Sequence, residues 1–196
     1  SEINKTVIGA RKCFDNLLEI FIKTENFDGL FLKLVQVFQL SGLEIIDANI
    51  STSTNKAIAA NTFIAKYSFH NRPLSNAEVK DVKLKISNNV NNLESKTKKL
   101  VFKKKKNGSF GKPFKISNDE QKDKKRNLLT IETADSPGLL VKIAKTLHEN
   151  GTSIYSARIN TLGDRVEDTF EIEDMTLSSV SSKKIKKISD SLKETM

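Results

Sequence analysis

The sequence contains the same pattern twice, 109 residues apart. Segment 22–52 aligns with segment 131–161 without a gap and is identical at 10 of 31 positions, where ordinary composition would give about two by chance. Thr62-Phe63 then matches Thr169-Phe170 at an offset of 107, so the loop after the first copy is two residues longer. A repeat defines the folding unit, and each copy is too small to bury a large core alone. We therefore expect two similar units that pack on each other.

Each copy predicts the same order of elements. An apolar, β-prone segment leads into a short turn, a helical pattern that starts at Leu30 or Leu139, and a glycine at the expected helix cap, Gly42 or Gly151. Two more strand-like segments and a second helix follow. The predicted strands are 17–24, 43–52 and 59–69 in the first copy and 128–133, 153–161 and 165–172 in the second, with final helices at 76–93 and 181–192.

This order, β-α-β-β-α, needs only one closing strand to form the split βαβ arrangement of the ferredoxin-like class. We predict an α+β chain of two such domains, each with a βαββαβ antiparallel sheet and helices on one face. The expected boundaries are 1–95 for the first domain, 96–126 for a Lys-rich linker and 127–196 for the second domain. Segment 113–118 is a candidate closing strand for the first copy, and segment 6–9 is a candidate extra strand.

The net charge of +9 resides in the linker. Segment 96–126 holds 13 Lys and Arg residues against 3 Asp and Glu residues, whereas the rest of the chain holds 20 against 21. The run Lys103–Lys106 lies at its centre, and 28 of the 33 basic residues are Lys. Base stacking and guanine contacts need aromatic rings and Arg, so nucleic acid is not the expected partner. A solvated linker is the simplest interpretation, and docking on an acidic protein surface is the alternative.

The sequence lacks the features of a membrane, secreted, disulfide-bonded or metal-dependent protein. The sequence has no apolar stretch of about 18 residues and no signal-peptide pattern, which favours a cytoplasmic location. A single cysteine, Cys13, excludes an internal disulfide. The two histidines, His70 and His148, stand in no metal-binding or hydrolytic motif. We therefore expect a non-catalytic segment without metal or cofactor. The first residue, Ser1, suggests a piece of a longer protein.

The turn between strand and helix in the second copy is the best candidate binding site. Free backbone N–H groups and the positive end of the helix dipole lie at such a junction and can hold a carboxylate. Gly138 permits close approach, and Asp135 can either cap the helix or pair with an ammonium group. The combination suits a free amino acid, and a simple helix cap is the alternative. The acidic stretch 167–174 is interpreted as a solvated sheet edge rather than a cation site.

Segment Asp135–Leu140, which reads DSPGLL, followed by Gly151, Ile154 and Ala157, resembles the ACT domain, an amino-acid-sensing module of ferredoxin-like fold. Segment 156–170 is similar to the last ACT domain of the bifunctional protein-PII uridylyltransferase/uridylyl-removing enzyme family. Segments 47–53 and 61–63 resemble the first ACT domain of the same C-terminal tail, and the basic connector with segment 114–118 resembles the family's inter-domain segment.

The resemblance implies a regulatory, glutamine-sensing region that controls modification of the PII signal protein in nitrogen regulation. The parent enzymes are nucleotidyltransferases and uridylyl-removing hydrolases, and their catalytic domains, which would need magnesium, lie N-terminal to the ACT pair. The implied partners are glutamine as effector, those catalytic domains, the PII protein and an ACT–ACT dimer; packing within one chain and between chains both remain open. The alternative is an ACT-type interaction module whose basic linker docks an acidic partner without binding an amino acid.

The resemblance also assigns residues to the ligand. The ligand carboxylate is expected at the N–H groups of Gly138 and Leu139, the ammonium near Asp135, and the side chain near the start of the next strand. The full expected set is Asp135, Ser136, Gly138, Leu139, Leu140, Ile154 and Tyr155. An equivalent but weaker site is expected at Asn26, Asp28, Gly29 and Leu30. It is expected to be weak because Asn26 is neutral, Phe27 is bulky and Asp28 places a negative charge where a carboxylate would arrive.

Overall fold

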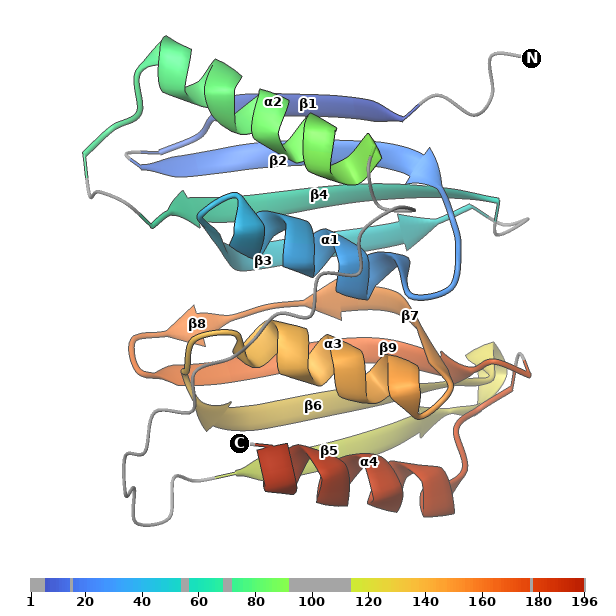
Figure 1. Ribbon diagram of the computed structural model, residues 1–196. Coiled ribbons are helices and arrows are strands. Elements are labelled where there is room, and N and C mark those ends of the chain that lie inside the picture. The colour runs from blue at the N-terminus through green and yellow to red at the C-terminus, as the bar shows by residue number, and fades with distance from the viewer. Residues whose placement is uncertain are drawn as a thin grey trace.

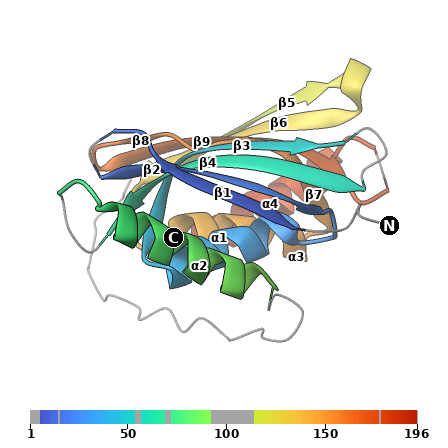
Figure 2. The same cartoon turned by 90° about the horizontal axis from the view of Figure 1, so that it is seen from above.

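Two antiparallel sheets lie side by side in the computed structural model, and the α-helices of the described residues cover one face of them (Figures 1 and 2). The structure describes residues 6–14, 16–53, 57–68, 72–91, 114–176 and 178–195. The first sheet contains β1 (Val7–Lys12), β2 (Leu17–Glu25), β3 (Leu43–Thr52) and β4 (Ile58–Tyr67), in the spatial order β1-β2-β4-β3. Its helices are α1 (Leu30–Leu40) and α2 (Asn76–Asn91).

The second sheet repeats this arrangement. It contains β5 (Lys115–Gln121), β6 (Arg126–Ala134), β7 (Thr152–Arg158) and β9 (Arg165–Asp174) in the order β5-β6-β9-β7, with the short β8 (Thr161–Leu162) paired to β9. Its helices are α3 (Leu139–Glu149) and α4 (Ser182–Thr195), and a 3-10 turn, η2 (Lys122–Lys124), joins β5 to β6. The α+β fold with two ferredoxin-like units, expected from the repeat, is confirmed.

Alternating side chains explain why each sheet buries one face. Along β2, the side chains of Leu18, Ile20 and Ile22 are buried beneath the helices, while Glu19 and Lys23 point to the open face. The helices supply the other half of the core, because α1 buries an apolar stripe that includes Leu34 and Phe38. The glycines predicted to follow α1 and α3, Gly42 and Gly151, have the left-handed backbone expected of helix caps.

The order of the strands along the chain differs from the predicted βαββαβ. In each copy the strand at the closing position comes first, so the observed order is ββαββα: β1 pairs with β2, and β5 pairs with β6. Segment 113–118 was predicted to close the first sheet, and this is wrong, because Lys115–Gln121 belongs to the second sheet. A short hairpin brings each edge strand to its neighbour, which is the more direct connection. The N-terminal strand predicted at 6–9 is present as β1.

The linker and the domain boundaries stay predictions. Residues 92–113, which include Lys103–Lys106, lie outside the described residues, as does His70. The described end of the 96–126 segment is not a simple connector, because it contains β5 and the start of β6. No helix in the described ranges has the length and hydropathy needed to cross a membrane.

The acidic stretch 167–174 does not lie at a sheet edge. It forms β9, which is hydrogen-bonded to β6 on one side and to β7 on the other. Asp168 is 1% exposed, and Glu171 and Glu173 are 9% and 8% exposed. The prediction of a solvated edge is therefore wrong. Two of these carboxylates lie beside the guanidinium group of Arg126, which is 3.4 Å from Glu171 and 3.6 Å from Glu173.

The two copies share one hydrophobic core. Strand β3 runs beside β7, and helix α1 lies against α3 (Figure 1). Phe31 of α1 packs edge-on against Phe170 of β9, with ring centroids 6.3 Å apart, and buried residues of both copies form a single cluster. The expectation that the copies pack on each other is confirmed, and within one chain. Because β3 and β7, like α1 and α3, are corresponding elements of the repeat, the two copies face each other about a local two-fold axis.

We predict that Phe38→Ala lowers the free energy of unfolding by about 3–5 kcal/mol, because it removes a fully buried ring and leaves a cavity. The Phe38 side chain is 0% exposed, and its ring centroid lies 4.5 Å from that of Phe63. Urea denaturation of the full chain would measure the change. Leu84→Ala on the exposed side of α2 is the control, because Leu84 is 52% exposed and should cost little. Equal losses in the two variants would contradict this account of the core.

Candidate functional site

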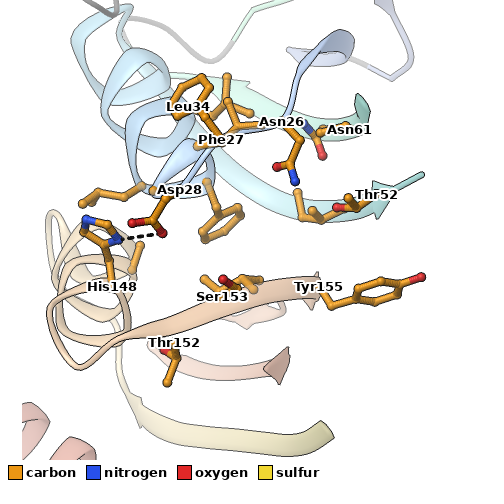
Figure 3. Close-up of a pocket in the computed structure, with 18 of the residues that line it drawn as sticks. Asn26, Phe27, Asp28, Leu34, Thr52, Asn61, His148, Thr152, Ser153 and Tyr155 are labelled. Carbon is orange, nitrogen blue, oxygen red and sulfur yellow. Dashed lines mark ion pairs between the residues drawn. The ribbon is translucent and has the colours of Figure 1, made fainter. Parts of the chain in front are cut away.

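Two pockets lie across the boundary between the copies. Each is formed by the turn before the first helix of one copy and the start of the facing edge strand of the other. Pocket 1 has a volume of about 280 Å³ and combines residues 26–29 of the first copy with residues 152–155 of β7 (Figure 3). Pocket 2 has a volume of about 430 Å³ and combines residues 135–138 of the second copy with residues 42–45 at the start of β3. The two pockets are thus counterparts under the local two-fold axis.

The structure divides the residues that the sequence grouped into one site. Asp135, Ser136, Gly138, Leu139 and Leu140 all line pocket 2. Ile154 and Tyr155 line pocket 1 instead.

In pocket 1, Ile154 and Tyr155 face the residues of the equivalent site, which are Asn26, Asp28, Gly29 and Leu30. The grouping of the turn with a strand of its own copy is therefore wrong, because each turn faces the edge strand of the other copy. From the facing strand of the first copy, Gly42, Leu43, Glu44 and Ile45 also line pocket 2, and sequence reasoning missed them.

Corresponding glycines begin the two helices. Gly29 and Gly138 are the N-caps of α1 and α3, with φ angles of 78° and 76°, and no side chain caps either helix. Only glycine adopts this backbone without strain. The alternative interpretation, in which Asp135 serves as the helix cap, therefore does not match the observed cap. The Leu139 N–H donates to the Ser136 carbonyl at 3.0 Å, so one of the two N–H groups expected to meet a ligand carboxylate is already engaged.

Asp168 is the important residue of pocket 2 that the sequence analysis did not assign to a site. It lines the pocket from β9 and is 1% exposed. The pKa of Asp168 is raised to about 7, mainly by burial and to a lesser extent by the nearby charge of Asp135, against a hydrogen bond that the Asn160 N–H donates to its Oδ1 at 3.2 Å. Aligning the two copies could have drawn attention to this residue, because at the offset of 107 the carboxylate of Asp168 stands where the first copy has the amide of Asn61.

The two pockets differ at two corresponding positions. Pocket 2 has the carboxylates of Asp135 and Asp168 where pocket 1 has the amides of Asn26 and Asn61. Among the described residues that line pocket 2, Glu44 is the third acidic side chain and none is Lys, Arg or His. Pocket 2 is therefore a region of negative potential, which favours a cationic group.

In pocket 1, the acidic side chains Asp28 and Glu173 each lie near a basic side chain. Asp28 Oδ1 lies 3.5 Å from His148 Nδ1 at the end of α3, so this pair bridges the two copies (Figure 3). Glu173, which also lines this pocket, lies 3.6 Å from Arg126, and the guanidinium group of Arg126 covers the ring of Tyr155. A Cβ at Gly29 would come within 3.1 Å of the His148 ring, so the glycine also allows the two copies to approach closely. Within the described part of the chain, no group of three or more His, Cys, Asp or Glu residues could hold a metal ion.

Comparisons with known proteins agree with the resemblance inferred from the sequence. No protein-family model matches the chain. The bifunctional uridylyltransferase/uridylyl-removing enzyme of Psychrobacter sp. (strain PRwf-1) is 29% identical over 178 residues, which are 89% of this chain and 19% of that protein. The enzymes of the same name from Burkholderia mallei (strain SAVP1) and Burkholderia pseudomallei (strain 668) are 28% identical over 168 residues, 82% of this chain and 19% of each protein.

This chain is similar to one segment of a bifunctional uridylyltransferase/uridylyl-removing enzyme. It spans about a fifth of the length of the curated relatives that it matches. Because 82–89% of the chain is aligned, the match extends into both copies of the repeat. The resemblance to this enzyme, inferred from residues 135–140 and 156–170, is confirmed at the level of these homologues.

We predict that Asp168→Asn removes a pH dependence from the stability of the chain. The pKa of Asp168 is about 7 in the folded chain, against an ordinary value of 3.8 for an exposed aspartate, so the folded state holds this proton more tightly than the unfolded state does. The free energy of unfolding should therefore fall by roughly a few kcal/mol as the pH rises from 4 to 7, and then level off. Urea denaturation at pH 5, 6, 7 and 8 would measure the difference between the wild-type chain and Asp168→Asn.

The reciprocal change is a matched control for this prediction. Asn61→Asp places a carboxylate at the corresponding, equally buried position of the first copy. It should add a pH dependence of the same sign to the one already present. Parallel pH profiles for the wild-type chain and Asp168→Asn would show that Asp168 titrates as an ordinary carboxylate.

Proposed function

We propose that this chain is the ACT-type regulatory region of a bifunctional uridylyltransferase/uridylyl-removing enzyme, and that glutamine binding in pocket 2 is its signal. On this proposal, the chain itself carries out no reaction. The catalytic domains, their magnesium and the PII protein substrate belong to the rest of the enzyme. The observation that carries the proposal is that exposed Asp135, in the turn before α3, and buried Asp168, on β9, line the same pocket between the two copies.

Pocket 2 offers complementary groups for both charges of a free amino acid. The N-terminus of α3 at Gly138 presents the positive end of a helix dipole, which suits the α-carboxylate. Asp135 and Asp168 suit the α-ammonium group, because a charged hydrogen bond between ammonium and carboxylate is stronger than a neutral one. Val35, Phe38 and Leu139 supply apolar surface for the aliphatic part of the side chain.

The position of the pocket supports a regulatory role. A ligand in pocket 2 would touch the turn at residues 135–138 in one copy and the start of β3 in the other. Its binding free energy would therefore depend on how the two copies are arranged. A ligand shifts an equilibrium only through its different affinity for the two states, and a site shared by two packed units supplies such a difference. Catalytic domains attached to this region would respond to the same shift.

We predict that Asp135→Ala abolishes glutamine binding at pocket 2 while the fold remains intact. The variant removes the charged partner of the ligand ammonium but leaves the Gly138 cap and the shared core unchanged. Isothermal titration calorimetry with glutamine, glutamate and asparagine would measure binding, and circular dichroism would verify the fold. Asp119→Ala is the control, because it makes the same charge change on exposed β5. A folded Asp135→Ala chain with unchanged affinity at this pocket would refute the assignment.

We also predict that glutamine affinity at pocket 2 increases as the pH rises from 6 to 7.5. An ammonium group binds the ionised form of Asp168, whose pKa is about 7 before binding, so binding must release a proton below that pH. Asp135 and Glu44 are the other acidic side chains that line the pocket. Calorimetry in two buffers of different ionisation enthalpy would count the released protons. Asp168→Asn should bind without proton release; an equal release in both chains would contradict the assignment.

A further inference from the structure

The face of the first sheet opposite the helices carries an apolar patch. Both sheets have their helices on the same side, and no helix of the described residues lies on the other side (Figure 2). Phe21 alternates with the buried Ile20 and Ile22 along β2, so its ring lies on this open face, where it is 38% exposed. Val7, which is 50% exposed, and Ile64 lie on the same face of the two neighbouring strands. We call Val7, Phe21 and Ile64 the open-face patch.

Gly9 leaves the ring of Phe21 uncovered. It lies directly opposite Phe21 in the pairing of β1 with β2. A Cβ at Gly9 would lie 3.8 Å from the Phe21 Cβ, which is an ordinary contact distance, so the fold has room for a side chain here. A glycine inside a strand often marks a place where another backbone approaches closely. The patch thus has the form of a surface that receives a partner.

The second copy has no such patch at the corresponding positions, which are Lys115, Thr130 and Glu171. Two of these residues are charged and take part in ion pairs on the sheet. Lys115 lies 2.9 Å from Glu132, and Glu171 lies 3.4 Å from Arg126. The solvated face of an antiparallel sheet is ordinarily polar in this way. The open-face patch is therefore a property of the first copy and not a requirement of the fold, which indicates a surface that meets a partner.

The charges beside the patch are complementary to themselves. Glu19 and Lys23 lie on β2, two residues before and two residues after Phe21, and point to the same open face. A second copy rotated by 180° about an axis through Phe21 would place each Glu19 opposite a Lys23. Arg11 already pairs with Glu19 within the chain, and a carboxylate can accept hydrogen bonds from both cations. A surface that matches itself under a two-fold rotation is what a symmetric dimer requires.

The dimensions of the open face fit a weak dimer. The face is four strands wide, and β2 contributes nine residues to its length. At about 4.8 Å between strands and about 3.3 Å per residue, the face measures on the order of 500 Å² for each partner. A total of about 1,000 Å² lies at the lower end of specific protein interfaces. We therefore expect an association that depends on protein concentration.

We propose that the open face of the first sheet is a self-association surface, on which two copies of this chain pack face to face with Phe21 at the two-fold axis between them. The contact requires no ligand, and none of the residues of the open-face patch lines pocket 1 or pocket 2. The inference is therefore independent of the proposed function. If that function holds, the contact joins the regulatory regions of two enzyme molecules.

Sedimentation velocity of the chain at concentrations from about 5 to 500 µM would test the proposal, because the expected dissociation constant of the dimer is micromolar. Phe21→Thr introduces the residue that the second copy has at this position and should raise that constant roughly tenfold or more, since each dimer loses two rings. Leu84→Ala is the control, because it removes a more exposed apolar side chain from α2, on the covered side of the sheet. A chain that stays monomeric throughout, or an unchanged constant in Phe21→Thr, would overturn the proposal.

A charge exchange on β2 tests the two-fold arrangement itself. Lys23→Glu places like charges opposite each other at two points of the dimer and should weaken it roughly tenfold. Adding Glu19→Lys restores opposite charges and should recover most of the lost affinity. Both changes are made in an Arg11→Ala background, so that the new lysine has no like charge beside it. Circular dichroism would verify the fold of each variant, and a double exchange that recovers no affinity would overturn the arrangement with Phe21 at the axis.

Discussion

The contact between the two copies is the interaction on which the rest of the structure depends. At the boundary, the edge strands β3 and β7 lie beside each other and α1 lies against α3. Each copy therefore covers the edge that the other would leave exposed. Phe31 reaches from the first copy onto Phe170 of the second, so the two cores are continuous. Burying apolar surface on both sides is what stabilises units of this size. The pockets exist only because this boundary holds a turn of one copy beside a strand of the other.

The repeat shows which features this architecture must keep and which it can vary. Gly29 and Gly138 keep the same left-handed backbone at the start of the two helices. The register shifts near Ile45 and Ile154 also recur, which gives both edge strands an irregularity beside a pocket. The buried polar side chains differ instead, with Asn61 in one copy and Asp168 in the other. The two copies therefore have the same backbone geometry at these positions but differ in the charge of the side chain buried in each pocket.

Local patterns predicted the elements well. The predicted strand 43–52 coincides with β3, and the predicted helix starts coincide with those of α1 and α3, because alternation and helical periodicity depend on near neighbours. The partner of β5 could not be predicted in this way. Its sequence, KISNDEQ, is mostly polar and exposed, so it contains no apolar alternation to indicate which sheet it joins.

The candidate site was predicted only in part, for a related reason. The turn 135–140, which the sequence singled out through its glycine and helix start, does line a pocket, because these are local features. Tyr155 was assigned to the wrong pocket because the packing of one copy on the other is not encoded in local spacing. Asp168 was missed because an acidic run resembles a solvated strand until its neighbours on both sides are known. Comparison of the two copies position by position, Asn61 against Asp168, was the one signal that could have identified it.

Because both copies contribute to each pocket, separating the two copies would divide both pockets. Each pocket takes one wall from residues before position 92 and the other from residues after position 113. Two separate polypeptides, one for each repeat, would thus possess only half of every cavity. The two polypeptides would have to reassociate before either pocket could bind a ligand, and a bound ligand would stabilise their association. If the proposed function holds, the extent of that reassociation would report the concentration of the ligand.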